Sequence, residues 1–131
     1  MINRIILKTL VGLNTIFFAT FALASPQAMI THNLTTTTTN AYVDGMAAPE
    51  PAAPNSTTRV PWHIVKLGCH KHRTEGVCPA VIKMDIDSDS AIEIGTLYVN
   101  LDNGVITPAK ISAHGFAVYV NAPGEITVVS E

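Results

Sequence analysis

Residues 80–101 read AVIKMDIDSDSAIEIGTLYVNL, and this stretch decides the fold class. Apolar and polar side chains alternate from Ala80 to Ile86, which is the pattern of a strand with one buried face. Residues 91–101 alternate as well, but their apolar positions change parity at Gly95. A glycine at a change of parity is typical of a β-bulge, so we expect two neighbouring strands with a bulge at Gly95.

The same composition extends over residues 60–131, where eighteen of the large apolar side chains are Val or Ile. Branching at Cβ favours strands over helices. Turn signals at Asp102-Asn103-Gly104, His114-Gly115 and Ala122-Pro123-Gly124 separate the apolar runs. We therefore predict an all-β domain, a small antiparallel meander of about six strands that forms a sandwich or a partly open barrel. The strands are expected at residues 62–67, 80–86, 91–101, 105–111, 116–120 and 126–129.

Residues 1–24 have the organisation of a secretory signal peptide. Arg4 and Lys8 precede an apolar stretch, and Ala22-Leu23-Ala24 offers small residues at the positions that signal peptidase reads. The apolar stretch is shorter than the roughly 20 residues that a membrane span needs. We expect cleavage after Ala24, no membrane span in the mature chain, and a periplasmic or secreted location.

Residues 25–59 differ from the domain that follows them. They contain a run of threonines from Thr35 to Thr39, prolines at positions 49, 51 and 54, and few large apolar side chains. A segment of this composition buries little apolar surface, which favours disorder. We predict a disordered Thr/Pro/Ala-rich linker, either a passive spacer or a stalk that holds the domain away from a surface.

The length and the net charge of the chain further limit the classes of function that it could have. The chain of 131 residues is short enough for a single folded domain. Removal of Arg4 and Lys8 with the signal peptide leaves six basic and ten acidic side chains, a net charge of −4. A mildly acidic chain lacks the basic surface typical of nucleic-acid binding, so we expect no nucleic-acid partner.

The most distinctive segment is CHKHRTEGVC, residues 69–78. Two cysteines in an exported chain predict a disulfide between Cys69 and Cys78. Closing this ten-residue ring should stabilise the domain by about 2.5–3 kcal/mol in the chain-entropy model. Two further hypotheses concern the residues inside the ring. In the first, His70 and His72 are ligands for copper or zinc. In the second, Lys71 and Arg73 form a basic binding loop.

Catalytic motifs are lacking in this sequence. It contains neither the G-x-S-x-G nucleophile motif nor the H-E-x-x-H zinc motif. We therefore expect a non-enzymatic protein without a cofactor, which acts by binding a protein or an envelope surface. The two alternatives are a periplasmic copper- or zinc-binding protein that uses the loop histidines, and a small inhibitor or effector that presents the disulfide loop.

Four short motifs carry a resemblance to a known group of proteins: Cys78-Pro79, Ile94-Gly95-Thr96, Asp102-Asn103-Gly104 and Gly124-Glu125-Ile126-Thr127-Val128. Behind a signal peptide, this series resembles small exported β-domain proteins of gamma-proteobacteria that live inside host cells. The resemblance covers residues from about 62 to 129. It implies export and a bacterial source, and it assigns no activity to any residue.

Overall fold

The computed structural model describes residues 24–131, and the two neighbouring strands expected within residues 80–101 are present. β5 (Val77–Met84) pairs antiparallel with β6 (Ile92–Asn100). Consecutive β5 residues lie opposite Gly95 and Glu93, so the pairing skips Ile94. This is the predicted bulge, and it turns apolar side chains on both sides of the skipped residue toward the core.

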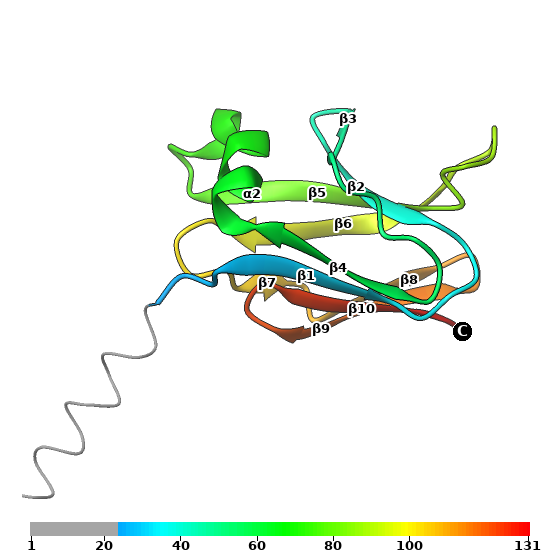
Figure 1. Cartoon of the computed structure of the whole chain (residues 1–131). Coiled ribbons are helices and arrows are strands. Elements are labelled where there is room, and N and C mark those ends of the chain that lie inside the picture. The colour runs from blue at the N-terminus through cyan, green and yellow to red at the C-terminus, as the bar shows by residue number, and fades with distance from the viewer. Residues whose placement is uncertain (1–23) are drawn as a thin grey trace, which may run out of the picture.

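Ten strands in residues 24–131 form two five-stranded sheets that pack as a sandwich (Figure 1). The first sheet has the strand order β4-β1-β10-β9-β8, and the second has the order β3-β2-β5-β6-β7. The remaining strands are β1 (Ala28–Asn33), β2 (Thr39–Val43), β3 (Met46–Ala47), β4 (Ser56–Pro61), β7 (Ile106–Thr107), β8 (Lys110–Ala113), β9 (Phe116–Ala122) and β10 (Glu125–Ser130). The all-β prediction is confirmed, and the described sheets form a sandwich without closing into a barrel.

The predicted meander is present but is divided between the sheets. β5, β6 and β7 are joined by hairpins in the second sheet, and β8, β9 and β10 are joined by hairpins in the first. The single strand expected at residues 105–111 is two strands, because the chain crosses between the sheets at Pro108. Proline lacks the N–H that a continuous strand would use, so the break falls at this residue. The His114-Gly115 turn is confirmed, and both residues have the positive φ of a tight hairpin.

The prediction that residues 25–59 are a disordered linker is wrong. This segment contains β1, β2, β3 and most of β4, and β1 lies inside the first sheet between β4 and the parallel strand β10. Its threonines do not behave as a polar spacer, because Thr35 and Thr39 are each 2% exposed. Asn33 is fully buried and hydrogen-bonds both sides of the β1–β2 connection. Buried hydrogen bonds therefore replace the apolar side chains that the segment lacks.

The strand expected at residues 62–67 is also wrong, because this segment is the helix α2 (Trp62–Gly68). A short 3-10 helix, η1 (His70–His72), follows it. These residues carry the chain from the edge of the first sheet to β5 of the second, at one end of the sandwich (Figure 1). Among residues 24–131 no strand pairs with this segment, and a helix satisfies much of its backbone hydrogen bonding internally. The helix is anchored by Trp62, whose indole N–H donates to the Leu101 carbonyl oxygen at 3.1 Å.

The predicted signal peptide lies outside the described residues, apart from Ala24 at its end. The described chain joins the sandwich directly after it, since the Ser25 hydroxyl donates to the Asp102 carbonyl oxygen at 2.7 Å. Within residues 24–131, the helices are too short to cross a bilayer.

Candidate functional site: an apolar cavity between the sheets

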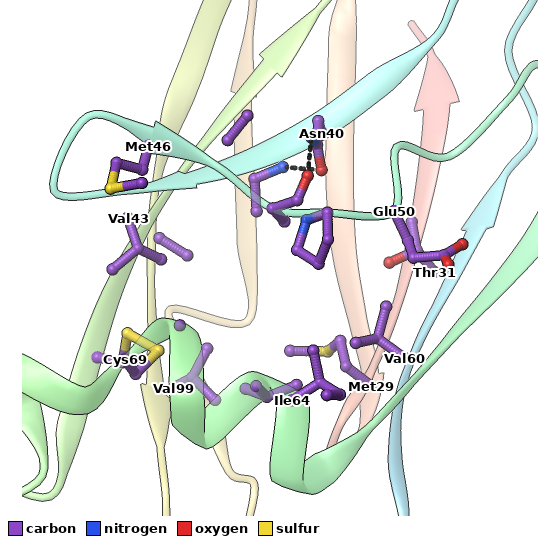
Figure 2. A pocket seen from close by; sticks show the side chains of 18 of the residues that line it. Met29, Thr31, Asn40, Val43, Met46, Glu50, Val60, Ile64, Cys69 and Val99 are labelled. Carbon is purple, nitrogen blue, oxygen red and sulfur yellow. Dashed lines mark hydrogen bonds between the residues drawn. A yellow bond between two sulfur atoms is a disulfide. The ribbon is translucent and has the colours of Figure 1, made fainter.

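The two sheets are packed together on one side of the sandwich and separated on the other. On the closed side β6 contacts β8, where the chain crosses between the sheets. On the opposite side the sheets end in their edge strands, β4 and β3. A cavity of about 300 Å³ lies between these edges and reaches into the core (Figure 2).

Three walls enclose this cavity. The first sheet contributes inward-facing side chains of β1, β4 and β10, and the second contributes those of β2, β5 and β6. Helix α2 and the disulfide form the wall at one end (Figure 2). The apolar side chains of the lining are Met29, Ala41, Val43, Met46, Ala47, Ala48, Ala52, Val60, Ile64, Val65, Leu67, Ala80, Ile82, Val99, Ile126 and Val128.

The lining is strongly apolar, and two of its polar side chains, Asn40 and Thr39, are engaged in hydrogen bonds. The Asn40 amide donates to the Ala48 carbonyl oxygen at 2.8 Å, and its oxygen accepts from the Ala41 N–H at 2.9 Å. The Thr39 hydroxyl donates to the Lys83 carbonyl oxygen at 2.8 Å. These bonds leave aliphatic side chains and methionines as the surface that a ligand would contact.

The two ends of the cavity differ in charge. Glu50 lies beside Thr31 at one end of the opening, and the disulfide stands at the other end (Figure 2). Lys71 and His70 also line the cavity, and both are exposed residues of the disulfide loop. Asp44 also lines the disulfide end, where it is paired with His72, so among residues 24–131 the unpaired charges of the lining are Glu50 at one end and Lys71 at the other, which could orient a polar ligand.

The predicted disulfide is present between Cys69 and Cys78. Cys78 is fully buried and Cys69 is 4% exposed, and both pack with Leu101 in a small apolar cluster. Because the bond joins the end of α2 to the start of β5, it fixes the loop that carries the basic end of the cavity.

His70 and His72 lie close in sequence but have different partners. A ring nitrogen of His70, Nδ1, lies 3.1 Å from the Leu67 carbonyl oxygen. Nε2 of His72 lies 3.0 Å from both carboxylate oxygens of Asp44, in the β2–β3 turn, and its Nδ1 lies 3.6 Å from Glu75. The hydrogen bond with Asp44 is the main cause of a raised His72 pKa.

These contacts bear on the metal-binding alternative. Both thiols are consumed by the disulfide, so neither sulfur is a thiolate ligand. Within residues 24–131, no three His, Cys, Asp or Glu side chains are placed to hold a metal ion together. The contact between His72 and Asp44 instead ties the disulfide loop to the β2–β3 hairpin at one end of the cavity.

The predicted binding-loop residues Lys71 and Arg73 separate in the structure. Lys71 lines the cavity, whereas Arg73 lies with His63 and Lys66 along a shallow depression beside α2. The predicted residues Cys69, His70 and Cys78 also line the cavity, and its remaining residues were not predicted as a site. They come from seven strands, a helix and two loops, and the apolar ones resemble ordinary core residues in the sequence.

A second cluster missed by the sequence analysis lies on the outer face of the first sheet. His32 on β1 joins the Thr57 hydroxyl of β4, at 3.0 Å from Nδ1, to the Glu125 carboxylate of β10, at 2.7 Å from Nε2. A hydroxyl, an imidazole and a carboxylate in this order can act as a nucleophile relay. Here they span three neighbouring strands on an exposed face, and none of them lines the cavity.

Comparisons with known proteins point to one family. The family model described as the type II secretion substrate NttC matches residues 3–131. The chain is similar to the crystal structure of the Legionella pneumophila type II secretion system substrate NttC, with 39% sequence identity and a TM-score of 0.79. That match covers 82% of this chain and 100% of the other. A search of curated proteins found no match.

Proposed function

This chain belongs to the NttC family of type II secretion substrates, and from that premise we propose a secreted, non-enzymatic binding protein whose ligand occupies the cavity between the sheets. The observation that carries the proposal is the cavity itself, about 300 Å³ in volume, open at the sandwich edge and lined by aliphatic side chains. Pockets for small ligands have this apolar character, with a few polar groups at their ends.

The size of the cavity limits the ligand. An engineered cavity of about 150 Å³ holds benzene, so twice that volume accommodates about twelve non-hydrogen atoms. Each buried methylene contributes about 0.8 kcal/mol, which corresponds to roughly a fourfold change in affinity. We therefore expect a ligand with an alkyl chain of about ten carbons.

A series of 1-alkanols tests this proposal by isothermal titration calorimetry. Affinity should rise roughly fourfold per methylene from hexanol to decanol, with one molecule bound per chain. Val60→Phe places a larger side chain at the cavity wall on β4 and should weaken decanol binding at least tenfold. Val105→Phe is the matched control, because Val105 is 46% exposed and lies outside the lining. The proposal fails if decanol does not bind, or if both variants bind it like the wild type.

The non-enzymatic part of the proposal is tested at the Thr57–His32–Glu125 cluster. Acyl transfer needs a substrate held over the nucleophile, and this cluster lies outside the cavity that would hold one. We expect no turnover of a panel of ester, amide and phosphate substrates by the purified mature protein. Turnover that disappears in Thr57→Ala and persists in the control Thr36→Ala would replace this proposal with a hydrolase.

Export is proposed to use residues 1–24 as a cleaved signal peptide, with the family's type II route completing secretion. The contact of Ser25 with Asp102 supports this boundary, because the sandwich begins at the residue that cleavage would leave first. Intact mass of the secreted protein should correspond to residues 25–131 minus two hydrogens for the disulfide. A mass that retains residues 1–24 would contradict this part of the proposal.

A further inference from the structure

We propose that the ligand of the cavity is an alkyl carboxylate with a single chain of about ten carbons, and that its carboxylate lies beside Lys71. The inference rests on the proposed function and deepens it by assigning the chemistry and the orientation of the ligand. It is carried by the distribution of charge around the cavity.

The basic end of the cavity belongs to a larger cationic region, which we call the basic cap, residues 62–74. This region contains three of the six Lys and Arg side chains in residues 24–131, three histidines and no acidic side chain. Among the described residues, its fixed cations Lys66, Lys71 and Arg73 form no ion pair within 4 Å. Of these three, Lys71 alone lines the cavity.

Acidic side chains near the basic end are already engaged. Asp44, which lines this part of the cavity, is held by His72 at 3.0 Å, and Glu75 approaches the same ring at 3.6 Å. The other carboxylate of the lining, Glu50, stands at the opposite end of the opening beside Thr31 (Figure 2). An anionic head group therefore meets an unpaired cation at the Lys71 end and a carboxylate at the other, so the head is directed to Lys71.

The apolar part of the ligand follows from the lining. From the Lys71 end, the cavity runs past the disulfide and Val43 toward Ile82 and Val128 in the core. About 300 Å³ accommodates about twelve non-hydrogen atoms, so the nine alkyl carbons of decanoate fit inside the cavity. A chain of this length buries its methylenes between the sheets while its carboxylate remains at the exposed loop.

Three ligands with the same ten-carbon chain test the inference: decanoate, 1-decanol and decyltrimethylammonium, titrated into the mature protein at low ionic strength. Decanoate should bind about twofold to fivefold more tightly than decanol, which is the range that an exposed ion pair gives. Decyltrimethylammonium should bind more weakly than decanol. The preference for decanoate should shrink in high salt because the charges are screened.

Two variants with the same change in net charge locate the head group. Lys71→Gln should remove the preference for decanoate and leave decanol binding unchanged. Lys83→Gln should keep the preference, because Lys83 lies outside the lining and over the Tyr42 ring. Equal binding of decanoate and decanol to the wild type, or a preference that survives Lys71→Gln, would overturn this inference and leave the proposed function intact. Failure of all three ligands to bind would refute both.

Discussion

Replacing Asn33 tests whether the threonine-rich segment belongs to the fold. Its side chain is fully buried at the end of β1. The amide group lies 2.8 Å from the Thr37 carbonyl oxygen and 3.0 Å and 3.1 Å from those of Ala52 and Ala53. The side-chain oxygen accepts from the N–H of Thr35 at 3.0 Å and from its hydroxyl at 2.7 Å. One residue thus joins the β1–β2 connection to the chain that precedes β4.

The loss of stability expected for Asn33→Ala depends on which hydrogen bonds each partner of the side chain keeps. The Ala52 carbonyl oxygen still accepts from the Thr39 N–H, and the Ala53 carbonyl oxygen still accepts from the Ser56 hydroxyl. The Thr35 N–H, in contrast, loses its acceptor within a buried site. Two lost donor bonds at about 1 kcal/mol each and one orphaned donor at about 1–3 kcal/mol give a loss of roughly 3–5 kcal/mol.

Urea unfolding followed by Trp62 fluorescence measures this loss, since Trp62 is the only tryptophan and is 6% exposed. The midpoint should fall with little change in the slope against urea, because the surface exposed on unfolding is nearly the same. Thr36→Ala is the control, an exposed threonine of the same segment whose replacement should change stability by less than about 0.5 kcal/mol. A loss below about 1 kcal/mol for Asn33→Ala would refute the conclusion that this segment is part of the core.

Three further predictions concern the domain boundary, the disulfide and pH. The fragment 60–131 should remain unfolded by circular dichroism, because it lacks β1, whose removal exposes the inner edge of β10. Replacing Cys69 and Cys78 together with Ser should lower the free energy of unfolding by about 2.5–3 kcal/mol in urea titrations. The pKa of His72 is raised above 6.5, mainly by Asp44, so the stabilisation from this pair is complete below 6.5 and is lost as pH rises through the folded-state pKa. His72→Gln should therefore lower Tm more at about pH 5.5 than at about pH 8.5.

Much of the second half of the fold could be predicted from the sequence. Alternating side chains identify β5 and β6, Gly95 marks the bulge between them, and His114-Gly115 forms the expected hairpin turn. These features are local, since a strand and its turn are specified by residues that lie next to each other in the chain. The disulfide was predictable for a different reason, because an exported chain with two cysteines leaves one pairing.

The prediction for the first half of the described chain was wrong because the contacts that stabilise it are polar and join residues far apart in the sequence. Thr35 and Thr39 are buried in place of aliphatic residues, and the parallel partner of β1 is β10 at the other end of the chain. From composition alone, such threonines are expected to be exposed to solvent. Helix α2 was missed because Ile64 and Val65 are β-branched, which favours a strand. Its position in the connection between the two sheets decides its conformation instead.

The cavity could not be predicted for the same reason. Met29, Val60 and Ile82 look like core residues in the sequence, and only the order of the edge strands places them around an opening. Lys71 was predicted as part of a binding loop, and its position at the cavity gives that prediction a specific ligand to test.

A titration of the mature protein with decanoate, followed by methyl NMR, tests most directly whether the cavity between the sheets is the binding site. We expect saturating shifts at the cavity methyl groups of Met29, Ile82 and Val128. The methyl groups of Val105, which is 46% exposed and outside the lining, should remain unchanged. Shifts confined to methyl groups outside the lining, or the absence of any shift at millimolar decanoate, would contradict the cavity as the binding site.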